Sequence, residues 1–388
     1  MLELIKRNTS ENSPITKSLS TMDLLHMIQD EKVKEEMIND QYLPVLRSLV
    51  YENEENNKHR FEGFTDVEMI YYFVHRQKHV DRSEKLSETT VKDYVRDIFQ
   101  FYKHWLQYLA SSHYKKEGET GNYLQFLEPR HIEMYQTDWM PEKAGYKPAT
   151  IARKSIVIRG FLRWLYKEGY LKTPLHSYFV SSAVKQKHTP NRDLTYEEVK
   201  MLLEYWKEKN HPINYAILTL LATTGLRIQE VCKAKWSELF YDSSTGHYFL
   251  SSKGKNEKHR DALIFPYVLE ALKDCRRRRR LPVELNRLDE TPLIPTRNQE
   301  FYDYTYLSRY VKKVIKETQL PFLETKPSDI TPHWFRHFFA NHSLDNGANL
   351  EYIRQTLGHS MLKTTLGYLN KNIERKNNAA LLWQQEEF

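Results

Sequence analysis

Residues 331–349, TPHWFRHFFANHSLDNGAN, combine a helix-opening proline with several imidazole and guanidinium side chains. Pro332 suits the first position of a helix, which places His333 and Arg336 one turn apart on one face. Both side chains would then lie near a helix N-terminus, whose free amide groups favour an anion. The segment therefore predicts a helix that binds a phosphate group.

Two other interpretations of this segment stay open. His333 and His337 have the i,i+4 spacing of metal ligands, but Arg336 would stand close to the cation and no third ligand is evident nearby in the sequence. Alternatively, these side chains cap the helix and pack in the core. We expect no metal site and no cofactor.

The chain N-terminal to this segment contains a second candidate phosphate-binding residue. A helix over 213–223 is apolar almost all round, so we expect it at the centre of a domain. Gly225 permits a sharp turn after it, Arg227 follows, and Glu230 is spaced to orient the guanidinium. An arginine–glutamate pair on a helix is also a common structural feature, so this signal is ambiguous alone.

Short strands are expected near 247–251 and 259–265, on either side of a basic turn at 252–258. The turn carries Lys253, Lys255 and Lys258, which can swing toward a phosphate or lie in solvent. The domain that holds these elements begins at residue 195, where Thr195 and Glu198 form a capping box.

Residues 355–368, QTLGHSMLKTTLGY, form the last cluster. Gly358 should end a helix begun near Leu350 and expose His359. A second short segment should bring Tyr368 back toward the same place.

Together these clusters hold the side chains needed for attack of a tyrosine on a phosphodiester. Guanidinium and imidazole groups can stabilise the negative charge of a phosphoryl transition state. The phenol, with an ordinary pKa of about 10, needs a base or a cationic field to become a nucleophile. The leaving oxygen of DNA needs a proton donor, which a lysine on a turn can supply.

The stretch 61–179 has helical apolar spacing throughout, with helices expected over 66–75 and 128–137 and longer ones beginning near 87 and 148. The opposite faces of the two long helices are basic and are either solvated or follow a DNA backbone. Their charged residues are Lys92, Arg96, Lys103, Arg153, Lys154, Arg159 and Arg163.

Composition agrees with a polyanionic partner. The 388 residues include 58 Lys and Arg against 51 Asp and Glu, a net charge of +7, and the first 60 residues are acidic, so the remainder is strongly basic. No apolar window reaches the length of a membrane span and the N-terminus lacks the apolar region of a signal peptide, so we expect a cytoplasmic, nucleoid-associated protein. Cys232 and Cys275 are expected to be buried small hydrophobes.

The segments TTGLRIQEV, SKGKNEKHR, TPHWFRHFFANHSLDNGAN and QTLGHSMLKTTLGY resemble the signature segments of the tyrosine recombinase (phage integrase) family. The resemblance covers nearly all of 195–370. The stretches TVKDYVRDIFQFYKHWL and ATIARKSIVIRGFLRWLYKEGY resemble the family's SAM-like core-binding domain. Six catalytic residue types occur in the family's order, and the nine-residue step from His359 to Tyr368 agrees with its pattern.

The resemblance implies that Arg227 and Arg336 clamp the scissile phosphate and that His359 adds a donor to the same oxygens. Tyr368 would attack to form a 3'-phosphotyrosyl link. Leu369 and Asn370, just after it, differ from the polar Ser/Thr-His that often follows the family's tyrosine, which leaves the local contacts open.

The resemblance also assigns the proton transfers. Lys253 would protonate the 5'-oxygen and release a 5'-hydroxyl, and His333 would assist proton transfer at the nucleophile. Lys253 is preferred over the other lysines of the turn because it occupies the family's usual place before the glycine. Neither metal nor nucleotide is required.

The implied fold is mainly α: an all-α SAM-like core-binding domain and a mostly helical catalytic domain with a small antiparallel sheet, forming a C-shaped clamp around DNA. The boundaries we expect are a polar N-terminal extension at 1–60 with a helix near 22–37, the core-binding domain at 61–183, a linker at 184–194, the catalytic domain at 195–370 and a tail at 371–388. The apolar run 379–383 of the tail should dock on a neighbouring subunit, or on its own chain.

The expected function is site-specific DNA recombination in a mobile element such as a phage, with double-stranded DNA as partner, a tetramer on DNA and possible accessory or directionality proteins. Two alternatives stay open: a DNA-binding regulator on the same scaffold without strand exchange, and a type IB topoisomerase-like enzyme. The arginine run 276–280 either touches the DNA backbone or is solvated.

Overall fold

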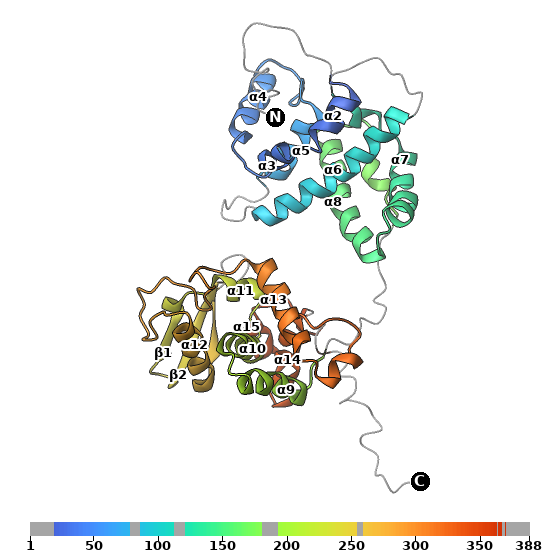
Figure 1. Ribbon diagram of the computed structural model, residues 1–388. Helices are drawn as coiled ribbons and strands as arrows, with labels where there is room; N and C mark the ends of the chain where they lie inside the picture. Colours follow the sequence, from blue (N-terminus) through green and yellow to red (C-terminus); the bar gives the residue numbers. More distant parts are fainter. Residues whose placement is uncertain are drawn as a thin grey trace, which may run out of the picture. The chain divides into compact units, whose positions relative to one another are not determined.

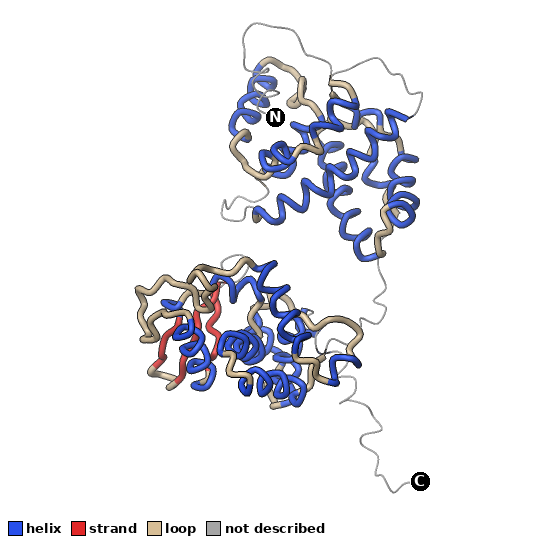
Figure 2. The backbone as a smooth tube through the Cα atoms, viewed as in Figure 1, coloured by secondary structure: helices blue, strands red, loops and turns tan. Residues whose placement is uncertain are grey.

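The computed structural model describes residues 19–77, 86–111, 121–180, 193–253, 259–362, 364–366 and 369. The chain divides into two compact units, Met1–Lys187 and His188–Phe388. Figure 1 and Figure 2 show that the first is helical and that the second combines helices with one small sheet. The expected linker falls largely outside the described residues, as does the tail.

The described part of the first unit is built from helices and helical turns. In chain order they are α2 (Thr21–Met27), α3 (Glu31–Glu36), α4 (Leu43–Glu55), α5 (Asp66–His75), α6 (Glu88–Ser111), η2 (Tyr123–Phe126), α7 (Pro129–Glu133), η3 (Met134–Lys143), α8 (Pro148–Lys167) and η4 (Leu175–Tyr178). The α5 helix has the predicted bounds, and α8 starts at Pro148 as predicted. The helix expected over 128–137 is instead a single α-turn continued by a π-helix, η3.

The expected boundary at residue 60 does not match the packing. The helix expected near 22–37 is two short helices, α2 and α3, each begun by its own N-cap, Ser20 and Asp30. Their buried residues, together with those of α4, belong to the same hydrophobic core as α5, α6 and α8. Residues 24–50 are therefore part of the core of the first unit, and treating all of 1–60 as an extension outside it is wrong.

A buried ion pair joins the two long helices of this unit. Lys154 on α8 is 5% exposed, and its Nζ lies 2.7 Å from Oδ1 of Asp97 on α6. The Arg153 guanidinium contacts the same carboxylate at 2.7 Å, and these two cations hold the pKa of Asp97 below its usual value against the effect of burial. The prediction that Lys154 lies on an exposed basic face is wrong, because its ammonium is buried and paired with Asp97.

The second unit is arranged around α10 (Pro212–Thr224), whose apolar side chains are buried on nearly every side, as predicted. It packs against α9, α12 and α14. The other helical elements are α9 (Tyr196–Glu208), α11 (Ile228–Lys233), η5 (Trp236–Glu238), α12 (Pro266–Arg278), α13 (Tyr304–Glu317), η7 (Pro321–Thr325), α14 (Pro332–Asp345) and α15 (Leu350–Leu357). The capping box of Thr195 and Glu198 is present at the start of α9.

The sheet has three antiparallel strands in chain order, β1 (Leu239–Asp242), β2 (His247–Lys253) and β3 (His259–Ile264). In the pairing of β2 with β3, Lys253 lies opposite His259 and Ser252 lies opposite Arg260. The register places the backbone of Lys253 at the end of the hairpin, as the sequence predicts. Residues 254–258 of the turn lie outside the described residues.

The arginine run at the end of α12 does not form a uniform surface. Arg276 is fully buried and donates to the carbonyl of Pro282 at 2.6 Å and to Asp289 at 2.6 Å. Its guanidinium also lies 4.3 Å from the ring centroid of Trp236. Arg276 therefore organises the chain that follows α12, and contact of this residue with DNA is excluded by its burial.

Both cysteines are buried and free, as predicted, and burial raises the pKa of each thiol to about 12. Across the described ranges, no helix has the length and apolarity to cross a membrane.

We predict that Asp97→Ala destabilises the first unit by about 3–5 kcal/mol, because it leaves the buried Lys154 ammonium without a carboxylate. Hydrogen exchange of peptides from α6 and α8, measured by mass spectrometry, should become faster. Lys34→Ala is the control, because the exposed pair of Lys34 with Glu31 contributes at most about 1 kcal/mol. Equal exchange in the two variants would contradict the assignment of Asp97 as a buried counterion.

Candidate active site

A left-handed glycine positions Arg227. Gly225 follows α10 with φ of 58°, and a Cβ at this position would lie 2.9 Å from side-chain atoms of Leu357 and Phe339. Both the backbone conformation and the close packing therefore require glycine. The turn leads directly into α11, for which Arg227 is the N-cap residue.

Glu230 holds Arg227 in the first turn of α11. Its carboxylate accepts hydrogen bonds from the Arg227 backbone N–H at 2.7 Å and from Nη1 at 3.0 Å. The Glu230 side chain is 5% exposed, whereas that of Arg227 is 39% exposed. The carboxylate thus fixes one edge of the guanidinium and leaves the rest accessible to an anion, in the arrangement that the sequence suggested.

Arg336 lies at the centre of the site. It sits in the first half of α14, which begins at Pro332 as predicted, and it is 1% exposed. Its Nη1 donates to the carbonyl of Gly225 at 2.6 Å, and its Nη2 donates to the carbonyl of Leu357 and to Nε2 of His359, the latter at 2.8 Å. One guanidinium thereby joins the turn before Arg227 to the loop that carries His359.

The contacts of His359 fix its tautomer. A guanidinium has no acceptor, so Nε2 must accept from Arg336, which leaves the proton on Nδ1 to be donated to Oγ1 of Thr365 at 2.9 Å. Burial, and then the charges of Arg336, Arg227 and Arg260, lower the pKa of His359 to about 3. The ring is therefore neutral here, and donation from Nε2 to a phosphate would require a change of tautomer or a proton.

The C-terminal end of α15 is satisfied by arginines. Gly358 ends the helix in the left-handed conformation, as predicted, and three nearby carbonyls accept from guanidinium groups. The pairs are Arg260 with Thr356, Arg336 with Leu357 and Arg354 with His359. Because a helix C-terminus carries partial negative charge, these contacts are favourable, and they fix the backbone on both sides of the histidine.

His333 is exposed at the N-terminal end of α14, and its ring centroid is 4.9 Å from that of His337 on the next turn. Across the described ranges, no three or more His, Cys, Asp or Glu side chains gather in the way that a metal site needs.

The remaining predicted residues divide into two sets. Tyr368, Lys255 and Lys258 lie outside the described residues, and for Lys253 only the backbone is described. In the first unit, Lys92 is exposed, and Arg96 and Arg153 are 58% and 46% exposed. Arg159 is partly buried, and its guanidinium donates to the carbonyl of Phe179 at 2.7 Å. Lys92 and Arg96 retain the exposure that a DNA contact needs.

Two residues of the site were not assigned by the sequence. Arg260 occurs within the segment SKGKNEKHR, but a basic residue at the end of a basic turn gives no sign that its side chain is buried. Thr365 is fully buried beneath His359, and a threonine three residues before Tyr368 carries no distinguishing pattern. The partners of Arg260 lie far away in the chain. The contact of Thr365 depends on how the chain turns after His359, which the sequence does not specify.

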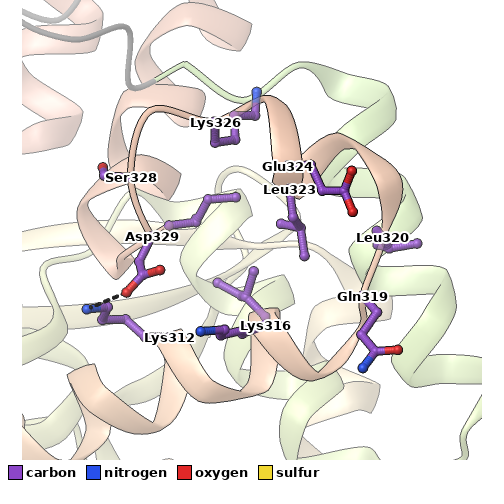
Figure 3. Close-up of a pocket in the computed structure, with 11 residues that line it drawn as sticks. Lys312, Lys316, Gln319, Leu320, Leu323, Glu324, Lys326, Ser328 and Asp329 are labelled. Carbon is purple, nitrogen blue, oxygen red and sulfur yellow. Dashed lines mark ion pairs between the residues drawn. The ribbon is translucent and has the colours of Figure 1, made fainter.

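A separate cavity of about 540 Å³ lies beside the second half of α13. Figure 3 shows Leu320 and Leu323 among its lining side chains and, at its rim, Lys312 in an ion pair with Asp329 at 3.0 Å. None of the predicted catalytic residues lines it.

Comparison with known proteins identifies similar sequences and structures. The Phage integrase family matches residues 192–375. The chain is 29% identical over 310 residues to "Tyrosine recombinase XerC" of Thermodesulfovibrio yellowstonii, covering 78% of this chain and 93% of that protein. It is 28% identical over 302 residues to "TnP I resolvase" of Bacillus thuringiensis, covering 78% and 96%.

Two solved structures share the fold. XerH site-specific recombinase bound to difH substrate, in a pre-cleavage complex, matches with a TM-score of 0.58 and 17% identity over 93% of this chain and 97% of that one. A lambda integrase dimer bound to a COC' core site matches with a TM-score of 0.54 and 17% identity over 74% and 73%.

The lowered pKa of His359 predicts a pH dependence of stability. The unfolded chain takes up a proton on this ring near pH 6.5, whereas the folded chain does not until about pH 3, so acid favours unfolding in this window. Between pH 6 and pH 4, the free energy of unfolding of the second unit should fall by up to about 1.4 kcal/mol per pH unit more in the wild type than in His359→Gln. Urea unfolding read out by a short protease pulse measures the difference, and parallel pH curves would contradict a buried neutral histidine.

Proposed function

Since this chain belongs to the tyrosine recombinase (phage integrase) family, enzymes that cleave and rejoin DNA strands, we propose that Tyr368 is the nucleophile of a site-specific recombination reaction. The observation that supports this proposal is the Arg336 guanidinium, which bonds both to the turn before Arg227 and to His359. These contacts bring Arg227, Arg336 and His359 together from separate segments, and all three would face one phosphate.

The reaction proceeds by exchange of one phosphodiester for another. The Tyr368 oxygen attacks phosphorus, a 3'-phosphotyrosyl bond forms, and the bond to the 5'-oxygen breaks. The phenolic proton leaves with the assistance of His333, and Lys253 gives a proton to the 5'-oxygen, which departs as a hydroxyl. Attack by a 5'-hydroxyl on the phosphotyrosine reverses these steps and rejoins a strand.

The charges of the site suit the transition state. Negative charge accumulates on the non-bridging phosphate oxygens, and donors that are already fixed in place stabilise it without reorganisation. Arg227 is accessible for this role, and Arg336 is held rigidly behind it. A phosphate that displaces the Arg336 contact with His359 would free Nε2, which becomes a donor to that phosphate once the ring takes up a proton or changes tautomer.

Double-stranded DNA is the substrate on this proposal. The exposed cations Lys92 and Arg96 on α6 are candidates for contact with the DNA backbone. Such an enzyme would act on the nucleoid in the cytoplasm, in the service of a mobile element. Accessory or directionality proteins would select between integration and excision.

The two alternatives are weaker. A regulator without strand exchange would be expected to have lost one of the catalytic residue types, and all six are present in the sequence. A type IB topoisomerase-like enzyme shares the chemistry but would act without site specificity or assembly. The core-binding stretch and the apolar tail favour the recombinase.

The tail gives a concrete proposal for assembly. Residues 379–388, AALLWQQEEF, combine an apolar run with two glutamates. The cavity beside α13 offers Leu320 and Leu323 to the apolar run and the ammonium of Lys316 to the glutamates, whereas Lys312 and Lys326 are paired with Asp329 and Glu198. We propose that this cavity receives the tail of a neighbouring subunit in a tetramer on DNA.

The nucleophile is tested by covalent trapping. Wild-type protein, without added metal, is incubated with nicked duplexes tiled across the DNA that flanks its gene, and denaturing gels reveal a protein–DNA adduct. Tyr368→Phe should abolish the adduct, and Arg336→Ala should lower its rate by about 100-fold or more, because a preorganised charged donor is lost. Specific binding without an adduct from the wild type would support the regulator instead.

The docking of the tail is tested by disulfide cross-linking. Two differently tagged copies, one carrying Leu323→Cys and the other Trp383→Cys, should form a mixed disulfide on DNA, with little background because both natural thiols are buried. Cys on exposed Tyr241 is the control partner for Trp383→Cys. A disulfide formed only within a doubly substituted chain would show that the tail docks on its own subunit.

A further inference from the structure

We infer that Arg260 is a positioning residue of the active site, which neutralises Glu230 and fixes the loop of His359 so that Arg227 and His359 can both face the scissile phosphate. This inference rests on the proposed function and adds a residue to its machinery.

Arg260 links three elements. It belongs to β3, its Nη2 forms an ion pair with Glu230 on α11, and its Nη1 donates to the carbonyl of Thr356 in the last turn of α15. Its side chain is 8% exposed. One buried guanidinium therefore connects the strand after the basic turn to the two loops that carry Arg227 and His359.

The ion pair determines how much positive charge Arg227 can offer. Glu230 is buried and accepts from Arg227 and from Arg260. With both arginines in place the three side chains carry a net charge of +1. Without Arg260, the carboxylate would pair with Arg227 alone, the net charge would be zero, and a phosphate would compete with Glu230 for the same guanidinium.

The contact with Thr356 fixes the backbone just before His359. Gly358 has φ of 64°, and a Cβ there would lie 3.3 Å from Cδ of Arg260, so the aliphatic part of the arginine packs directly on the glycine turn. Arg260 thereby restrains this turn by both a hydrogen bond and packing. Displacement of a catalytic group by about 1 Å can slow a reaction about 100-fold.

The side chain of Arg260 affects the residues proposed to contact the phosphate, Arg227 and His359, and not the proposed proton donor Lys253. Its backbone lies opposite Ser252, next to Lys253, but the strand pairing uses main-chain groups that a side-chain substitution keeps. Loss of the guanidinium should therefore disturb Arg227 and His359 and leave proton donation by Lys253 intact.

The test compares single-turnover adduct formation by Arg260→Met and wild type on the nicked duplex that traps the wild type. We expect the rate at saturating protein to fall by about 100-fold, with the half-saturating concentration changed by less than about threefold, because positioning is lost and binding is kept. Replacing the 5'-bridging oxygen by sulfur, a leaving group that needs no proton donor, should not restore the rate. Arg260→Lys keeps a charge beside Glu230 but lacks the fork that also reaches Thr356, so it should recover only part of the rate, to within about tenfold of the wild type.

Arg276→Met is the matched control, because it removes another buried arginine that bonds to a carboxylate and to carbonyls in the same unit. At a temperature where all variants are folded, it should keep the wild-type rate. The inference is overturned if the two methionine variants lose the same activity, if Arg260→Met keeps the wild-type rate, or if sulfur restores it. Failure of the wild type to form any adduct would instead refute the proposed function.

Discussion

The site depends on a guanidinium that is buried where charge is costly. Arg336 has almost no contact with solvent, so its charge is acceptable only because backbone carbonyls and an imidazole nitrogen surround it. These partners come from two other segments of the second unit. The arginine that binds substrate in the proposed reaction is thus also the group that holds those segments together.

This arrangement explains the left-handed conformation of Gly225 and Gly358. Gly225 and Gly358 bring the ends of α10 and α15 close enough for the carbonyl of Gly225 itself and that of Leu357, just before Gly358, to accept from the Arg336 guanidinium. A side chain at Gly225 would meet Leu357, the residue whose carbonyl Arg336 also binds. The backbone conformation at these glycines and the hydrogen bonds that stabilise the Arg336 charge therefore depend on each other.

The sequence predicts helices whose ends carry local signals. It does not predict side-chain pairs between residues that are far apart in the chain. Pro332, Gly358 and the capping box at Thr195 mark element ends by local chemistry, and the structure has those ends. The burial of Lys154 could not be predicted, because it requires knowing that Asp97 on another helix faces it. Arg260 was overlooked for the same reason, since its partners lie 30 and 96 residues away.

The shared core of the first unit has a further consequence for how the chain can be shortened. Leu24, Leu46 and Val50 are fully buried against helices that begin after residue 60. A chain cut at the acidic-to-basic transition would expose the apolar faces that these residues cover, and such surfaces promote aggregation. The change from acidic to basic composition therefore falls inside one folded unit and does not mark a domain boundary. The acidic N-terminal helices must be kept with the basic region if the shortened protein is to stay monodisperse.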